Sequence, residues 1–208
     1  VKHNRMKNLV LLSLFFVTGV FIKAQTIEEN IQAFKDSYAA EADGNFTIAI
    51  QRLEEVYKGN SYELNLRLGW LNYLNQDYSK SSDYYQRSMK LLPYAFEAKL
   101  GYVAPEAAMG NWNNVMEVYE KILKTDPQNT LVNYRMGAIY FERKDYQMAH
   151  QYLEKVVNLY PFDYDSVVLF AWTNYHLGKL RQAQVLFERA LMIRPDDTSS
   201  REGLNLIK

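Results

Sequence analysis

Four prolines divide the chain at equal intervals: Pro93, Pro127, Pro161 and Pro195 follow one another at a spacing of 34 residues. Proline cannot continue a helix, because it lacks a backbone N–H and pushes the preceding residue towards an extended conformation. A fixed period of about 20 to 50 residues is typical of repeat arrays, in which each unit packs against its neighbours. The spacing therefore predicts a helical solenoid, a class whose stacked helix pairs present long surfaces to other molecules.

The composition suits one folded domain with a sizeable apolar interior, since the 208 residues are 48% hydrophobic and 23% charged. Aromatic residues are abundant, with 17 Tyr, 10 Phe and 3 Trp. There are no cysteines, which excludes disulfides, thiolate metal sites and a cysteine nucleophile. We therefore expect packing alone to stabilise the fold.

The first 24 residues differ from the rest of the chain. Three basic residues precede an uncharged apolar run, Leu9–Ile22, and the small residue Ala24 follows. This order is typical of a secretory signal peptide, and 14 residues are fewer than the roughly 20 that cross a bilayer as a helix. We expect residues 1–24 to be a secretory signal peptide with upstream residues. The protein is then exported, and is periplasmic or in the cell envelope if its source is bacterial.

The cleavage site of this leader is imperfect, because Ile22 stands where a small residue is usual. Retention as an uncleaved anchor therefore remains an alternative, whereas a cleaved chain should have no stable membrane insertion. The leader carries four basic residues and no acid, so the mature chain has 20 basic and 24 acidic residues, a net charge of −4. It has no basic patch with interleaved aromatic residues, which argues against a nucleic-acid partner.

From residue 26 the sequence predicts helices and turns in alternation. Thr26 and Glu29 fit a capping box, in which each side chain accepts a hydrogen bond from a free amide at the helix start. No low-complexity stretch or flexible linker interrupts the remainder. We therefore expect a single domain over residues 25–208.

Several units carry small and apolar residues at matching offsets. The unit 130–163 has Met136, Gly137, Tyr140, Asp145, Tyr146, Ala149, Leu153, Val156 and Pro161. The unit 62–95 has Leu68, Gly69, Asp77, Tyr78, Ser81, Tyr85, Ser88 and Pro93, and the unit 164–197 has Phe170, Ala171, Gly178, Leu180, Ala183, Phe187, Ala190 and Pro195. This pattern resembles the tetratricopeptide repeat (TPR) family. The resemblance implies an all-α, right-handed α-solenoid of about five helix-turn-helix repeats with a C-terminal capping helix over residues 198–208.

Two units depart from the pattern. In the unit 96–129, Val103 stands where the family has a small residue, and Pro105 falls inside the first helix, which it should kink or shorten. Its turn and second helix fit, with Gly110 and Trp112 among the matching residues. In this family the turn aromatic fills the gap between units, so Trp112 is expected to be core. The unit 30–61 is two residues short and lacks the exit proline.

In this family the binding surface usually lies on the inner face of the first helices. That face carries residues at helical spacing, namely Phe34 and Tyr38; Leu66, Trp70 and Tyr73; Leu100, Ala104 and Ala107; Tyr134, Ala138 and Phe141; Val168, Trp172 and Tyr175. If part of this stripe stays exposed, it forms an apolar groove suited to an amphipathic helix or an extended peptide. The alternative is that the rings are core. The candidate groove residues are Trp70, Tyr73, Tyr134, Phe141, Trp172, Tyr175, Arg67 and Arg135.

Other kinds of site find little support. A carboxylate clamp of Lys and Asn is not supported, because Leu66, Trp70, Leu100 and Ala104 occupy the relevant columns. Arg67 and Arg135 lie beside these columns, where a solvated or salt-bridged side chain is expected. No catalytic motif, metal site or cofactor site is predicted. His150 and His176 have a packing or surface role, and Asp163 and Asp165 are helix caps.

The sequence thus predicts an exported, non-enzymatic module that binds a protein or peptide in an aromatic groove, as an adaptor or assembly factor. The alternative is a structural subunit or self-associating scaffold of a cell-envelope complex. The partner and the oligomeric state stay open.

Overall fold

The computed structural model describes residues 26–207, which form eleven α-helices and no strand. The helices are α1 (Ile27–Ala42), α2 (Phe46–Glu54), α3 (Tyr62–Leu74), α4 (Tyr78–Leu91), α5 (Phe96–Ala108), α6 (Trp112–Thr125), α7 (Thr130–Glu142), α8 (Tyr146–Leu159), α9 (Tyr164–His176), α10 (Leu180–Ile193) and α11 (Thr198–Ile207). None of these helices is long and apolar enough to cross a membrane. The expected leader, residues 1–24, lies outside the described residues.

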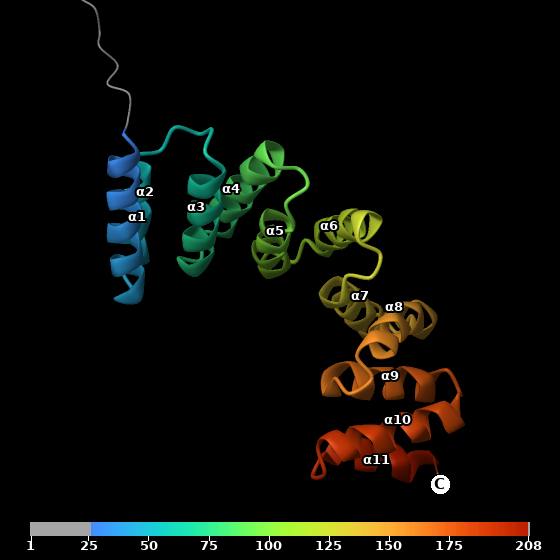
Figure 1. The fold of residues 1–208 in the computed structure, drawn as a ribbon. Coiled ribbons are helices and arrows are strands. Elements are labelled where there is room, and N and C mark those ends of the chain that lie inside the picture. The colour runs from blue at the N-terminus through green and yellow to red at the C-terminus, as the bar shows by residue number, and fades with distance from the viewer. Residues whose placement is uncertain (1–25, 208) are drawn as a thin grey trace, which may run out of the picture.

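The helices stack as five antiparallel pairs followed by the single helix α11, which confirms the predicted solenoid (Figure 1). The odd-numbered helices α3, α5 and α7 line the inner side of a curve, and α4, α6 and α8 lie on its outer side (Figure 1). The chain changes direction between α6 and α7, so that α1–α6 form one arm and α7–α11 the other. Leu204 and Ile207 of α11 pack against the last core cluster, as expected of a cap.

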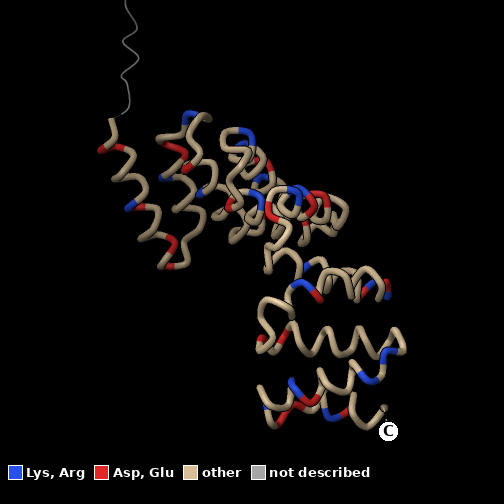
Figure 2. The backbone as a smooth tube through the Cα atoms, turned by 45° about the vertical axis from the view of Figure 1, so that its right-hand side comes forward, with Lys and Arg blue, Asp and Glu red and all other residues tan. Residues whose placement is uncertain are grey.

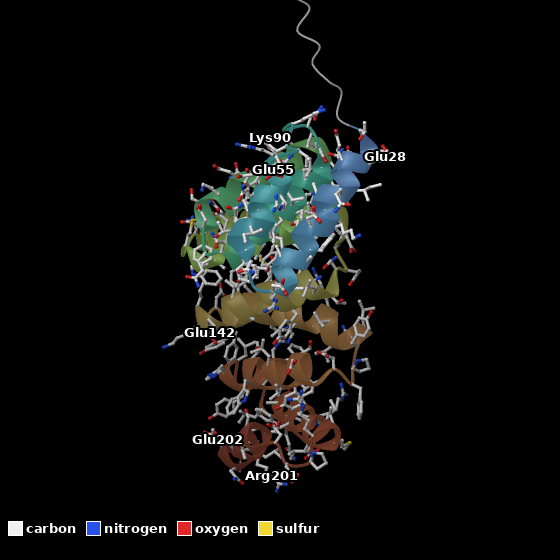
Figure 3. The ribbon with its side chains drawn as sticks, turned by 90° about the vertical axis from the view of Figure 1, so that its left-hand side faces the viewer. Glu28, Glu55, Lys90, Glu142, Arg201 and Glu202 are labelled. Atoms are coloured by element: carbon white, nitrogen blue, oxygen red, sulfur yellow. The ribbon has the colours of Figure 1, made fainter. Side chains whose placement is uncertain are left out.

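Charged residues are scattered over both arms without a face of one sign (Figure 2). The labelled side chains Glu28, Glu55, Lys90, Arg201 and Glu202 lie on the outside of the solenoid, where water solvates them (Figure 3). The pairs Lys121–Glu117 and Arg52–Glu55 join exposed side chains one helical turn apart. Such exposed ion pairs add little to stability. Packing of the helices therefore dominates the fold.

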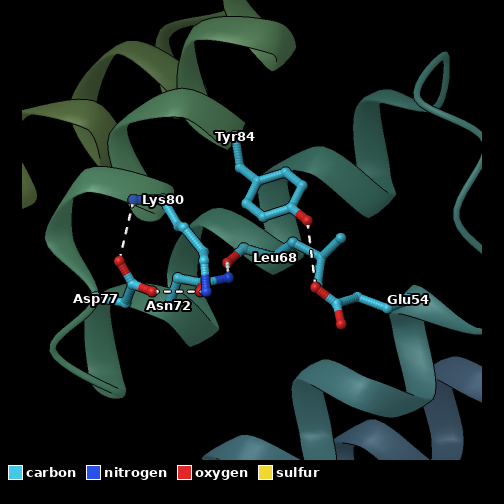
Figure 4. Close-up of polar contacts among 6 residues, drawn as sticks. All are labelled: Glu54, Leu68, Asn72, Asp77, Lys80 and Tyr84. Atoms are coloured by element: carbon cyan, nitrogen blue, oxygen red, sulfur yellow. Dashed lines mark hydrogen bonds and ion pairs between the residues drawn. The ribbon is translucent and has the colours of Figure 1, made fainter.

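Local hydrogen bonds set the helix ends. Thr26 and Glu29 form the predicted capping box at the start of α1. Asp77 caps α4 by accepting a hydrogen bond from the Lys80 amide (3.3 Å), and it also forms an ion pair with the Lys80 ammonium (2.9 Å) (Figure 4). The Tyr84 hydroxyl also reaches Glu54 on the preceding unit (3.5 Å; Figure 4).

A recurrent contact that sequence reasoning missed holds the loops between units. The fourth residue of three units and of the cap donates a side-chain hydrogen bond back to a carbonyl of the preceding loop. These contacts are Asn65 to Gly59, Lys99 to Pro93, Asn133 to Pro127 and Arg201 to Pro195. These hydrogen bonds fix the loop that follows the second helix of each preceding unit.

Close helix packing depends on glycines that face large side chains. A Cβ at Gly101 would lie 2.3 Å from the Tyr85 ring, and one at Gly203 would lie 2.3 Å from the Phe187 ring. Tyr85 also packs on Gly69 of its own unit. Gly101 of α5 thus allows the close approach of α4 in the preceding unit, a different contact from the one that Gly69 and Gly137 make within their own units.

Of the two effects predicted for Pro105, a kink or a shorter helix, the shortening is wrong. Helix α5 continues to Ala108 and has 13 residues, the same length as α3, α7 and α9. The Met109 amide donates to the Pro105 carbonyl (3.0 Å), so the hydrogen-bond ladder resumes after the proline. Tertiary contacts of the next residue, Glu106, hold this end of the helix in place.

Glu106 is buried and joins three helices. Its carboxylate accepts hydrogen bonds from Ser82 Oγ on α4 (2.6 Å) and Asn114 Nδ2 on α6 (2.7 Å). Burial alone would raise the pKa of Glu106, but the hydrogen bonds from Ser82, Asn114, Asn111 and Tyr102 together lower it below its ordinary value.

We expect Glu106→Gln to lower the free energy of unfolding by about 1.5–3 kcal/mol, because an amide N–H₂ would face a donor. The pKa of Glu106 is lower in the folded state, so its contribution is full above the unfolded pKa, about 4.5, and is lost as pH falls through the folded value. Urea titrations at pH 7 and pH 3 measure the difference in free energy of unfolding between wild type and Glu106→Gln. A difference between wild type and variant that does not shrink at pH 3 would contradict the expectation.

Candidate functional site on the inner face

The eight candidate groove residues come from α3, α7 and α9, and they fall into an exposed and a half-buried group. Trp70 is 40% exposed and Arg135 is also exposed. The other six are half-buried: Arg67, Tyr73, Tyr134, Phe141, Trp172 and Tyr175. The stripe is therefore neither fully core nor a continuous open groove.

The N-terminal hollow, a space of about 770 Å³, lies between α1, α3 and α5. Phe34, Tyr38, Leu66 and Trp70 line it. Tyr38 is 53% exposed. Most of its lining is thus apolar or aromatic, with Glu63, Arg67 and Glu97 as the charged residues, and the hollow is open to solvent.

Arg67 lies in this hollow and is salt-bridged, one of the two states expected for it. It pairs with Glu41 of α1, and its guanidinium carbon lies 4.1 Å from the centroid of the Tyr38 ring. The Trp70 indole N–H donates to the second oxygen of Glu41 (2.7 Å). Burial lowers the pKa of Arg67 from its ordinary value. Glu41 thus neutralises the cation of the hollow from within the chain.

The C-terminal aromatic cluster consists of Phe141, Tyr146, Trp172, Tyr175 and His176. Tyr146 and His176 stack with their ring centroids 4.3 Å apart, and Phe141 meets both rings edge-on. Trp172 packs against Tyr175 (5.6 Å). These rings fill the space between α7 and α9 that an open groove would need. His176 thus has a packing role, one of the two expected for it, whereas the stacking of His176 on the turn residue Tyr146 was not predicted from the sequence.

Trp172 is also tied to the structural core. Its indole N–H donates to Ser199 Oγ of the cap (2.9 Å), and its ring lies 5.0 Å from the ring of buried Phe187. Its role in the fold is therefore larger than that of Trp70.

The central cleft, a space of about 690 Å³, lies between α5, α6 and α7 at the bend of the solenoid. Its lining includes Ala104, Ala107 and Ala138, small residues at positions where the second and fifth units carry large rings. The junction of α6 with α7 is the least extensive of those between consecutive units, and no packing comparable to that of α3 on α5 joins α5 to α7. The cleft opens because small side chains meet a loose junction.

Apolar side chains around the cleft are exposed. Trp112 at the start of α6 is 46% exposed, and Leu131 at the start of α7 is 48% exposed. The expectation that the turn aromatic Trp112 is core between units is therefore wrong, because α7 does not close over α6 at the bend.

Arg135 and Tyr134 lie next to one another on α7. Arg135 lines the central cleft and makes no ion pair with any of residues 26–207. Tyr134 is half-buried, and burial, followed by the charge of Asp165, raises its pKa. Of the two candidate arginines, only Arg67 is thus already neutralised.

The remaining titratable candidates have structural roles. His150 packs edge-on against Phe170 (4.8 Å) and lies 2.9 Å from the Lys179 ammonium, and burial with this charge lowers its pKa. Asp163 caps α9 by accepting from the Ser166 amide (3.1 Å). No group of three His, Cys, Asp or Glu side chains within residues 26–207 is placed to hold a metal ion.

Comparison with known families agrees with the repeat pattern. Residues 85–199, more than half of the chain, match the EMC2 TPR-like repeat domain family. The chain belongs to this family. Its TPR units are the helix pairs described above, and the fold is that of a protein–protein interaction module, generally a non-catalytic scaffold.

Solved structures with the same fold are distant in sequence. A tetratricopeptide repeat protein from Parabacteroides merdae ATCC 43184 superimposes with a TM-score of 0.73 at 16% identity, over 86% of this chain and 72% of that one. MamA 41-end from Desulfovibrio magneticus RS-1 has a TM-score of 0.68 at 18% identity, over 82% of this chain and 98% of its own. At such identities the similarity shows a shared TPR fold alone.

Proposed function

We propose that this TPR protein is an exported adaptor or assembly factor that binds a segment of another protein on its inner face. The observation that carries the proposal is the pair of apolar hollows along the odd-numbered helices, the N-terminal hollow and the central cleft. Exposed rings such as Trp70 and Trp112 give large contact areas and anchor interfaces.

The proposal that the protein is exported rests on residues 1–24, whose sequence has the order of a secretory leader. A cell-envelope location follows if the source is bacterial. Intact-mass measurement of the protein from its host tests the address, since export with cleavage removes these residues and an unprocessed chain retains them.

Replacing Trp70 with alanine should weaken partner binding at least about tenfold, the cost of removing one anchoring ring. Tagged wild-type and variant protein are captured from the native cells, and the crosslinked partner is quantified by mass spectrometry. The melting temperature should change little, because Trp70 is 40% exposed.

The matched control is Tyr94→Ala, which removes an aromatic ring that is 87% exposed in the loop before α5 and lines neither hollow. Equal loss of the partner in this control, or loss of the fold in Trp70→Ala, would count against a binding role for Trp70.

A second candidate function is a structural subunit or self-associating scaffold. It is favoured by exposed apolar residues in the loops and helix ends between units, with Tyr94 at 87%, Phe162 at 65% and Met192 at 72% exposure. In the same capture experiment, crosslinks confined to these loops and unchanged in Trp70→Ala would support this function instead of inner-face binding.

A further inference from the structure

We propose that the central cleft binds an amphipathic helix of the partner, and that a carboxylate of this helix pairs with Arg135. The inference rests on the proposed function and narrows it to one cleft and one partner chemistry.

Two arginines at equivalent positions differ in whether the chain supplies them with a carboxylate. Arg67 and Arg135 each occupy the sixth position of their units, 62–95 and 130–163. Arg67 pairs with Glu41, the twelfth residue of the preceding unit. At the position equivalent to Glu41, the unit before Arg135 carries Ala107. The chain therefore supplies a carboxylate to one arginine and leaves both the charge and the space of the other available.

Two arginines and one glutamate are the charged residues that line the cleft. Arg135 and Arg143 line it, both are exposed, and neither forms an ion pair within residues 26–207. Glu142 is the one acid among the lining residues, and it lies exposed at the edge of the molecule (Figure 3). The cleft thus has a net positive charge.

The second residue of the first helix is an acid in three units and a leucine in the unit whose first helix, α7, lines the cleft. That position is Glu63 in α3, Glu97 in α5 and Asp165 in α9, but it is Leu131 in α7. The cleft therefore has an apolar side chain where equivalent positions carry an acid. Both differences favour a partner that combines apolar side chains with carboxylates.

A helical partner fits this lining better than an extended one. The walls are sides of helices, whose backbone groups are already paired within each helix. An extended segment would bury N–H and C=O groups against Leu100, Val103 and Ile139 without partners. A helix satisfies its own backbone, and the small residues Ala104, Ala107 and Ala138 allow the close approach of about 8–10 Å between axes that helix packing requires.

The test uses two designed peptides of about four helical turns. They share one leucine stripe and differ only in its flanking residues, which are glutamates in one peptide and lysines in its twin. Binding to the purified protein is measured by fluorescence anisotropy. We expect the glutamate peptide to bind at least about tenfold more tightly than the lysine twin.

Three variants assign this preference to Arg135. Arg135→Glu should reverse it, so that the lysine twin binds more tightly. Arg181→Glu makes the same charge change at an exposed site on α10 and should leave the preference unchanged. Ala107→Glu places a carboxylate beside Arg135, and Ala107→Gln adds a side chain of the same size without the charge. Ala107→Glu should weaken binding of the glutamate peptide at least about fivefold more than Ala107→Gln does. Circular dichroism confirms that each variant is folded.

The outcomes separate this inference from the proposed function. Equal binding of the two peptides, binding of neither, or no reversal in Arg135→Glu would overturn the cleft as an acidic-helix site. The proposed function would survive such a result if a natural partner still crosslinks beside Trp70. It would fail if no partner crosslinks to the inner face at all.

Discussion

Replacing Phe187 with alanine is expected to lower the free energy of unfolding by about 3–5 kcal/mol, the range for deleting a fully buried aromatic ring. Phe187 is 0% exposed and packs between Gly203 of the cap and Trp172 of α9. The backbone at Gly203 cannot move freely into the volume that the Phe187 ring leaves, so a cavity should remain. Urea unfolding followed by circular dichroism measures the loss.

The position of this loss distinguishes a solenoid from a globular domain. Each unit of a repeat array contacts only its neighbours, so the damage should concentrate in α9, α10 and α11. Hydrogen exchange should accelerate there and remain nearly unchanged in α1–α4. Uniform acceleration along residues 26–207 would contradict local stabilisation of the repeats.

Replacing Gly101 with alanine should lower the free energy of unfolding by about 1–3 kcal/mol, because the added methyl group overpacks a filled contact. Its Cβ would lie 2.3 Å from the Tyr85 ring, which is 4% exposed and held on its other side by Gly69. Thermal melting of the variant measures the effect. The change is expected in spite of the higher helix propensity of alanine.

A double-mutant cycle identifies the cause of that loss. Tyr85→Leu introduces the side-chain type that Leu153 provides at the equivalent position of the fourth unit. Gly101→Ala should cost less in this background than in wild type, because the smaller side chain makes room. Strictly additive losses would show that the Tyr85 contact is not responsible.

The predictable part of this protein is the part set by local rules. Proline spacing located the loops, the Thr26 capping box located the start of α1, and the small residues Gly69 and Gly137 located close helix contacts. These signals depend on residues within one unit, and the unit repeats. The fold class and the resemblance to TPR proteins therefore follow from the amino-acid sequence alone.

Pro105 shows why local rules fail in the third unit. In isolation a proline in a helix should shorten it, yet α5 keeps its full length because Glu106 accepts hydrogen bonds from Ser82 on α4 and Asn114 on α6. Neither partner is close to Glu106 in the helix pattern, so no local rule includes them. Trp112 fails for a similar reason, since its exposure depends on how α6 meets α7.

The candidate site was also predicted in part from the sequence and decided in part by the tertiary structure. Sequence reasoning identified the inner face and selected Arg67 and Arg135 together, as arginines with the same place in their units. Only the tertiary structure separates them, because Glu41 reaches Arg67 across a unit boundary while Ala107 leaves Arg135 unpaired.

The sequence by itself determined the period, the loops marked by the prolines and most of the residues that face the core, since each follows from chemistry within about 34 residues. The tertiary structure decided which parts of the inner face are open. Rings of α7 and α9 close on one another, whereas small residues and a loose α6–α7 junction leave the central cleft. The physical reason is that an opening between units depends on the volumes and charges of side chains from two or three helices at once, which the repeat pattern of one unit does not specify.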